Sequence, residues 1–160
     1  MYFEKKEIGI NKEYSKNGYL IQSVANTKSF QKINDIFHKI LRKKINSKMD
    51  YQNILNSTHK FINKKNLNDF RLSIMKELNN NKKFKSFFYD ICKPYVDSIV
   101  GNELAMQKNI NLSIQNPQDD SSLLDVHSDT WTGDSSYEVV VWLPLVDCYS
   151  TKSMYLMSKE

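Results

Sequence analysis

The chain has 160 residues, of which 40% are hydrophobic and 12% aromatic, so it is long and apolar enough to bury a core, and a wholly disordered protein is excluded. Its net charge of +5 is uneven, because residues 1–110 carry 21 basic and ten acidic residues whereas residues 111–160 carry two and eight. The lysines are scattered and no nucleic-acid-binding motif is visible, so we expect no nucleic-acid partner.

The same composition argues against membrane insertion and secretion. The longest apolar run, residues 139–146, is too short to span a bilayer, and residues 1–10 lack the apolar region of a secretory signal. Two cysteines do not make a disulfide framework. We therefore expect no membrane partner and a cytoplasmic location.

Four helices are predicted between residues 27 and 100, because apolar residues recur there at intervals of three and four. Their apolar positions are, in chain order, Phe30, Ile33, Phe37, Ile40, Leu41 and Ile45; Ile54, Leu55, Phe61 and Ile62; Leu67, Phe70, Ile74 and Leu78; and Phe84, Phe87, Phe88, Ile91, Tyr95 and Ile99. We expect Thr27 or Ser29 to cap the first helix, and Pro94 to bend the fourth or end it early. Residues 19–24 are predicted as an early strand.

Beyond residue 105 the period shortens to that of β-strands. Ile110, Leu112 and Ile114 alternate with polar residues, which predicts a half-buried strand. Further strands are predicted at residues 124–129, 138–144 and 153–157, the second of them covered on both faces. The sequence thus predicts one α+β domain over residues 1–160, in which a helical half (1–104) packs on a sheet (105–160).

His127 and Asp129 are the candidate metal ligands. Side chains two apart in a strand point to the same face, so an imidazole nitrogen and a carboxylate oxygen can reach one point. They would supply two of the three ligands of a facial triad, which holds Fe(II) and leaves three positions open. The ordinary alternative is that Asp129 caps the following turn and His127 merely ends a strand.

The surrounding segment SIQNPQDDSSLLDVHSDTWTGDSSYEVVVWLPLVD resembles the iron(II)- and 2-oxoglutarate-dependent dioxygenases, in particular the phytanoyl-CoA dioxygenase-like branch and related oxygenases of bacterial carbohydrate and antibiotic clusters. The stretch EYSKNGYLI is also similar to that branch. The resemblance implies a double-stranded β-helix (jelly-roll) core with helices on one face. It also implies Fe(II) on His127 and Asp129, 2-oxoglutarate as co-substrate, and hydroxylation of a small metabolite such as a carbohydrate.

The sequence departs from this family in one respect. A distal histidine and an arginine for 2-oxoglutarate are missing, since no histidine follows His127 and the arginines, Arg42 and Arg71, lie in the helical half. His38 and His59 are weak substitutes for the third ligand. We therefore expect an incomplete jelly roll that binds iron weakly, and either self-association or a complementing C-terminal segment.

Four further residues are candidates for binding. Lys108, Asn111 and Gln115 would bind the co-substrate, and Trp131 would wall the substrate pocket. The alternatives are solvent-facing polar residues and a tryptophan packed beneath the turn. Two rival functions remain open. The first is a chain without catalysis, either a jelly-roll binding or interaction domain or an inactive truncated fragment of the enzyme. The second is a basic helical module that binds an acidic partner.

Overall fold

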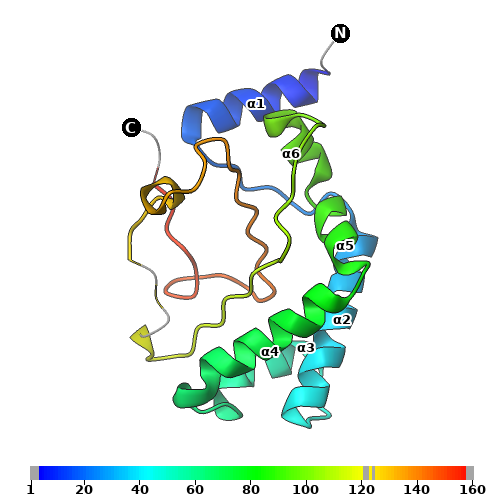
Figure 1. The fold of residues 1–160 in the computed structure, drawn as a ribbon, viewed down its shortest axis with the longest axis vertical. Coiled ribbons are helices and arrows are strands. Elements are labelled where there is room, and N and C mark those ends of the chain that lie inside the picture. Colours follow the sequence, from blue (N-terminus) through cyan, green and yellow to red (C-terminus); the bar gives the residue numbers. More distant parts are fainter. Residues whose placement is uncertain (1–3, 121–122, 124, 158–160) are drawn as a thin grey trace.

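The structure, a computed structural model, describes residues 4–120, 123 and 125–157. The helices form an arc along the top, right and bottom of the view, and the chain beyond residue 100 lies inside this arc as mostly irregular segments (Figure 1). The elements in chain order are α1 (Lys5–Asn17), α2 (Thr27–Ile45), α3 (Tyr51–Ser57), η1 (Thr58–Lys60), η2 (Lys64–Asn66), α4 (Leu67–Asn80), α5 (Phe84–Asp90), α6 (Lys93–Val100) and η4 (Asp129–Thr132).

The helix boundaries follow local capping chemistry. Asn26 caps α2 through its side chain, which accepts a hydrogen bond from the Ser29 amide at 3.0 Å, so the expected caps Thr27 and Ser29 were wrong by one and three residues. α2 ends at Asn46, whose φ of 52° is left-handed, a conformation that asparagine tolerates. Pro94 lies in the first turn of α6 and separates it from α5, which confirms the predicted interruption.

The core lies between α2, α3, α4 and α5. Ile33, Leu41, Ile54 and Ile74 are almost fully buried, and they project from the predicted apolar stripes. Each such side chain contributes about 1.5–3 kcal/mol by leaving water. The helical predictions over residues 27–100 are therefore confirmed, although Phe61 and Ile62 follow η1 instead of continuing a helix. α1, which packs against α6, was missed, and residues 19–24 form no strand.

The predicted sheet is wrong. Among the described residues there is no β-strand, so the α+β class and the jelly-roll core are contradicted. Residues 110–115, 138–144 and 153–157 are irregular segments, and so is the described part of 124–129, since Leu124 lies outside the described residues. Residues 139–143 are half-buried or exposed, although burial on both faces was expected.

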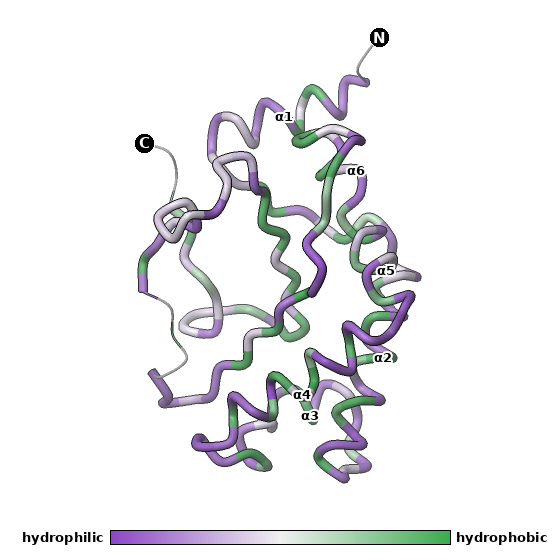
Figure 2. Tube along the Cα trace, in the orientation of Figure 1, coloured by the Kyte–Doolittle hydropathy of each residue, from purple (hydrophilic) through white to green (hydrophobic). Residues whose placement is uncertain are grey.

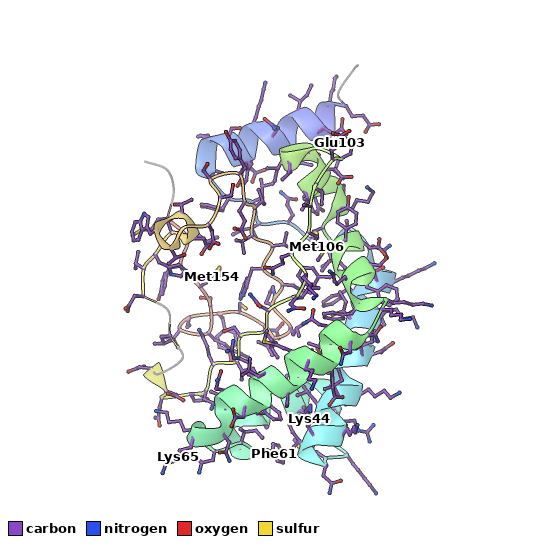
Figure 3. All side chains as sticks on the ribbon, viewed as in Figure 1. Lys44, Phe61, Lys65, Glu103, Met106 and Met154 are labelled. Atoms are coloured by element: carbon purple, nitrogen blue, oxygen red, sulfur yellow. The ribbon has the colours of Figure 1, made fainter. Side chains whose placement is uncertain are left out.

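The strand-like periodicity nevertheless has a structural counterpart. Ile110 is buried, Leu112 and Ile114 are half-buried against the helical core, and the intervening residues are exposed. Figure 2 shows the apolar character that continues into the chain around residues 139–146. Side chains occupy the space that the ribbons leave open between the helices and the returning chain (Figure 3). Alternation therefore predicted correctly which face of residues 110–115 is buried, but a sheet also needs hydrogen-bonded neighbours.

Candidate metal-binding site

His127 and Asp129 lie where the returning chain makes a tight turn. Ser128 is extended, and Asp129 begins the 3₁₀ turn η4, which ends at Gly133 with a left-handed φ of 101°. The Asp129 carbonyl accepts hydrogen bonds from the Thr132 hydroxyl at 2.8 Å and from the Asp134 amide at 3.3 Å. The backbone carbonyl of Asp129 thus stabilises the turn, and the Asp129 carboxylate takes no part in these two hydrogen bonds.

The two side chains converge as the metal hypothesis requires. His127 Nε2 lies 3.5 Å from Asp129 Oδ1, and the side chains are 44% and 47% exposed. A cation about 2.0–2.2 Å from each atom fits between atoms at this separation. The pair therefore has the reach of two neighbouring ligands, although it lies at a 3₁₀ turn and not on a strand.

A hydrogen bond to the backbone orients the imidazole. His127 Nδ1 lies 2.6 Å from the Asp125 carbonyl oxygen, which only accepts, so Nδ1 carries the proton. In the neutral ring, Nε2 then presents a lone pair to the Asp129 carboxylate. A metal ion placed between Nε2 and the carboxylate would receive an electron pair from each of them. The sequence carries no signal for this contact, because any residue at position 125 supplies a carbonyl.

The donor set is incomplete within the described residues. They contain no group of three histidine, cysteine, aspartate or glutamate side chains that could hold a metal ion. His38 contacts the Met49 carbonyl at 3.3 Å and the edge of the Tyr51 ring, and His59 lies in η1. The described part of the chain therefore brings two candidate metal ligands together but does not form a facial triad.

The predicted co-substrate residues lie on the outer face of the chain that crosses α4. Lys108, Asn111 and Gln115 are exposed, and none of them makes a hydrogen bond to the described residues. Trp131 lies in η4, two residues after Asp129, and is 74% exposed. Their proposed roles remain predictions, and any ligand they bind would have to meet them at the surface.

The two arginines of the chain, Arg71 and Arg42, are both engaged in hydrogen bonds. Arg71 Nη1 donates to the Leu112 carbonyl at 3.2 Å and Nη2 donates to Asn68 Oδ1 at 2.8 Å. Arg42 Nε donates to the Ser47 carbonyl at 3.3 Å. Arg71 therefore links α4 to the returning chain, and Arg42 supports the C-terminal end of α2.

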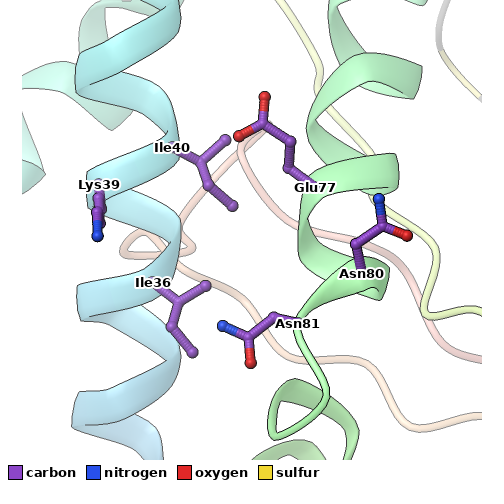
Figure 4. Close-up of a pocket in the computed structure, with 6 residues that line it drawn as sticks. All are labelled: Ile36, Lys39, Ile40, Glu77, Asn80 and Asn81. Atoms are coloured by element: carbon purple, nitrogen blue, oxygen red, sulfur yellow. The ribbon is translucent and has the colours of Figure 1, made fainter.

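A pocket of about 390 Å³ opens between α2 and α4 (Figure 4). Its lining residues are Ile36, Lys39, Ile40, Glu77, Asn80 and Asn81. The Lys44 ammonium lies 2.7 Å from Glu77 and, by hydrogen bonding, lowers the pKa of that carboxyl. None of the sequence-predicted site residues lines this pocket, so it is separate from the histidine–aspartate pair.

The chain matches no protein-family model, no curated protein and no solved structure. Among the described residues, every helix is too short or too polar to cross a membrane.

Proposed function

We propose that the chain supplies His127 and Asp129 to the iron(II) site of a 2-oxoglutarate-dependent oxygenase that hydroxylates a small metabolite such as a carbohydrate. The observation that carries the proposal is the convergence of His127 Nε2 and Asp129 Oδ1 to 3.5 Å, with Nδ1 tied to the Asp125 carbonyl. The choice of Fe(II) as the metal and of 2-oxoglutarate as the co-substrate rests on the resemblance of residues 113–147 to the dioxygenases.

The residues of this chain would act by holding and orienting the metal. The Asp125 carbonyl fixes the imidazole tautomer, so that Nε2 is the free donor, and Asp129 brings one negative charge. One imidazole and one carboxylate leave a divalent ion with a net positive charge, which attracts the anionic co-substrate. A third protein ligand would come from outside the described residues. Iron bound there would supply the activation of O₂, one oxygen atom of which would enter the succinate formed by decarboxylation of 2-oxoglutarate and the other the C–H bond of the metabolite.

Metal binding is tested with Mn(II), a paramagnetic substitute for Fe(II), on the 160-residue chain. We expect Mn(II) to broaden the NMR signals of the His127 ring before those of His38 and His59, and we expect His127→Ala to weaken binding by at least about tenfold. His59→Ala is the matched control and should leave the affinity unchanged. Equal broadening of all three histidines would contradict the proposed site.

Catalysis is tested separately, by succinate formation from 2-oxoglutarate with Fe(II) and ascorbate. We expect the chain alone to be inactive, because two protein ligands and no free arginine hold the co-substrate poorly. A polypeptide that supplies a histidine and an arginine should restore turnover that depends on His127 and Asp129. Turnover that persists in His127→Ala would refute the assignment.

We place this activity in the cytoplasm, where iron stays reduced. The half-buried Cys92 and the exposed Cys148 are both free thiols, as is usual in a reducing compartment. The proposed partners are the small-molecule substrate and a complementing polypeptide, with neither nucleic acid nor membrane.

A second candidate function is a basic helical module that binds an acidic partner. One face of α2 favours it, because Lys28, Lys32, Lys39 and Lys43 are all exposed along the helix. Binding to heparin, used as a polyanion probe, should then weaken steeply with salt and with charge reversal at Lys32 and Lys39. Heparin affinity that is insensitive to both changes would exclude this candidate.

A further inference from the structure

Residues 139–143 have the composition of a central strand but lie unpaired. Three valines, a tryptophan and a leucine follow one another, all of them residue types that favour strands or apolar cores. Figure 1 shows this stretch as an extended, irregular path through the middle of the molecule. We call these five residues the open segment.

One side of the open segment is anchored to the molecule. Val139, Val141 and Leu143 are half-buried, and Leu143 packs against the helical core. The alternate residues point outward, since Val140 is 62% exposed and Trp142 is 48% exposed. The segment therefore already has the two-residue alternation of a strand that lies on a core.

The backbone of the open segment has no hydrogen-bond partner among the described residues. In a folded protein such a row of amide and carbonyl groups is a template for an added strand. Adding a strand would cost this chain little conformational entropy, because the side chains that would form the inner face are already placed.

The acidic residues that flank the open segment in the sequence indicate which kind of partner it would attract. Residues 109–151 contain seven acidic residues and no lysine or arginine. Glu138 precedes the segment directly, and Asp134 and Asp147 lie four or five residues beyond its ends. A second copy of the segment would bring like charges together, whereas a strand with lysine or arginine at its ends would be attracted.

We propose that the open segment is a docking edge for a basic, extended polypeptide, which adds to it as a β-strand. Main-chain hydrogen bonds would supply the affinity, and the outward Val140 and Trp142 would select apolar side chains at alternate positions of the partner. This proposal is independent of metal binding by His127 and Asp129.

The test uses the full chain and a short peptide in which threonine and valine alternate between terminal lysines. Hydrogen exchange of the amides of residues 139–143 should be fast in the free chain and about tenfold slower with the peptide bound. A control peptide with glutamate in place of lysine should bind about threefold to tenfold more weakly, and an N-methylated peptide that lacks the donors of one edge should give no protection.

Two proline variants test whether the peptide binds to the open segment. Val141→Pro removes one donor and blocks strand addition, so it should abolish protection, while Tyr155→Pro, at a residue 86% exposed, should leave it intact. Circular dichroism shows whether either variant keeps the helical fold. Protection that is equal with the glutamate peptide overturns the proposal. Protection that grows with protein concentration and no peptide also overturns it, because the occupant would then be a second copy of the chain.

Discussion

The side-chain amide of Asn79 pairs with the backbone of Ile110 through two hydrogen bonds. Asn79 Nδ2 donates to the Ile110 carbonyl at 3.0 Å, and the Ile110 amide donates to Asn79 Oδ1 at 2.8 Å. The carboxamide thus does for Ile110 what a neighbouring strand does in a sheet. Because Ile110 is buried, its backbone would otherwise be deprived of water without a partner.

We predict that Asn79→Ala destabilises the chain by about 1–3 kcal/mol, since it leaves one buried donor and one buried acceptor unsatisfied. Asn79→Asp keeps the acceptor but loses the donor, so its free energy of unfolding should lie between those of the unmodified chain and Asn79→Ala. The measurement is the free energy of unfolding in urea. Asn80→Ala, at the exposed neighbouring position of α4, is the control and should change stability by less than about 0.5 kcal/mol.

The same relationship explains why the helices could be predicted from the sequence and the sheet could not. A helix satisfies its own backbone, so the stripe of Ile33, Phe37 and Leu41 was sufficient to predict α2. A strand needs a partner that its own residues do not specify. For residues 110–115 the partners are side chains of α4, Asn79 and Arg71, and periodicity carries no information on such contacts.

The candidate site, like the fold, could be predicted only in part from the sequence. The His-x-Asp spacing predicted that His127 and Asp129 approach each other, and Nε2 lies 3.5 Å from Oδ1, but the strand on which this inference rested is a 3₁₀ turn. Side chains two apart converge here because Ser128 is extended and Asp129 starts the turn. The spacing therefore indicated the pair, and Thr132, Gly133 and Asp134 indicated the turn that follows it, whereas the residue pattern carries no signal for the Asp125 contact that orients the imidazole.

The two cysteines should differ in reactivity. Burial raises the pKa of the Cys92 thiol to about 11, and its Sγ donates to the Phe88 and Tyr89 carbonyls at 3.5 and 3.4 Å. Its thiolate fraction near neutral pH is therefore reduced about 100-fold relative to a thiol with a pKa of 9.0. We predict that iodoacetamide modifies the exposed Cys148 first.

Mass spectrometry of the alkylated chain checks this order. In Cys148→Ser the folded protein should resist modification, and reactivity should return in denaturant. Raising the pH toward 11 should increase Cys92 labelling. Equal labelling of both thiols in the folded chain at pH 7 would show that Cys92 is not protected.

The Lys44–Glu77 pair beside the α2–α4 pocket should shift a titration. The hydrogen bond from Lys44 lowers the pKa of Glu77, and burial opposes this effect. A depressed carboxyl pKa stabilises the fold above the unfolded value of 4.5, and that contribution is lost as the pH falls through the lower folded value. Because Glu77 is about one-third exposed, we expect less than about 1 kcal/mol.

Carboxyl carbon NMR measures this titration directly. In Lys44→Met the Glu77 midpoint should rise toward its ordinary value, whereas Lys39→Met, which removes a cation that lines the pocket, should leave it nearly unchanged. A midpoint that moves equally in both variants would mean that general surface charge, and not the 2.7 Å contact, sets it.

The last prediction concerns Gly133, which ends the turn that positions Asp129. Its φ of 101° suits glycine, and a Cβ at this position would meet no atom within 4 Å, so the cost of a side chain is purely conformational. We predict that Gly133→Ala strains the turn by about 1–2 kcal/mol and reduces Mn(II) affinity about fivefold to thirtyfold, because Asp129 Oδ1 is no longer held near His127 Nε2. Gly133→Asn should lose less, since asparagine tolerates the left-handed region. The turn lies outside the helical core, so it can open locally to relieve this strain, and the urea midpoint should not change. An unchanged Mn(II) affinity in Gly133→Ala would mean that the turn does not position the pair, while a lowered urea midpoint would mean that the turn contributes to the fold itself.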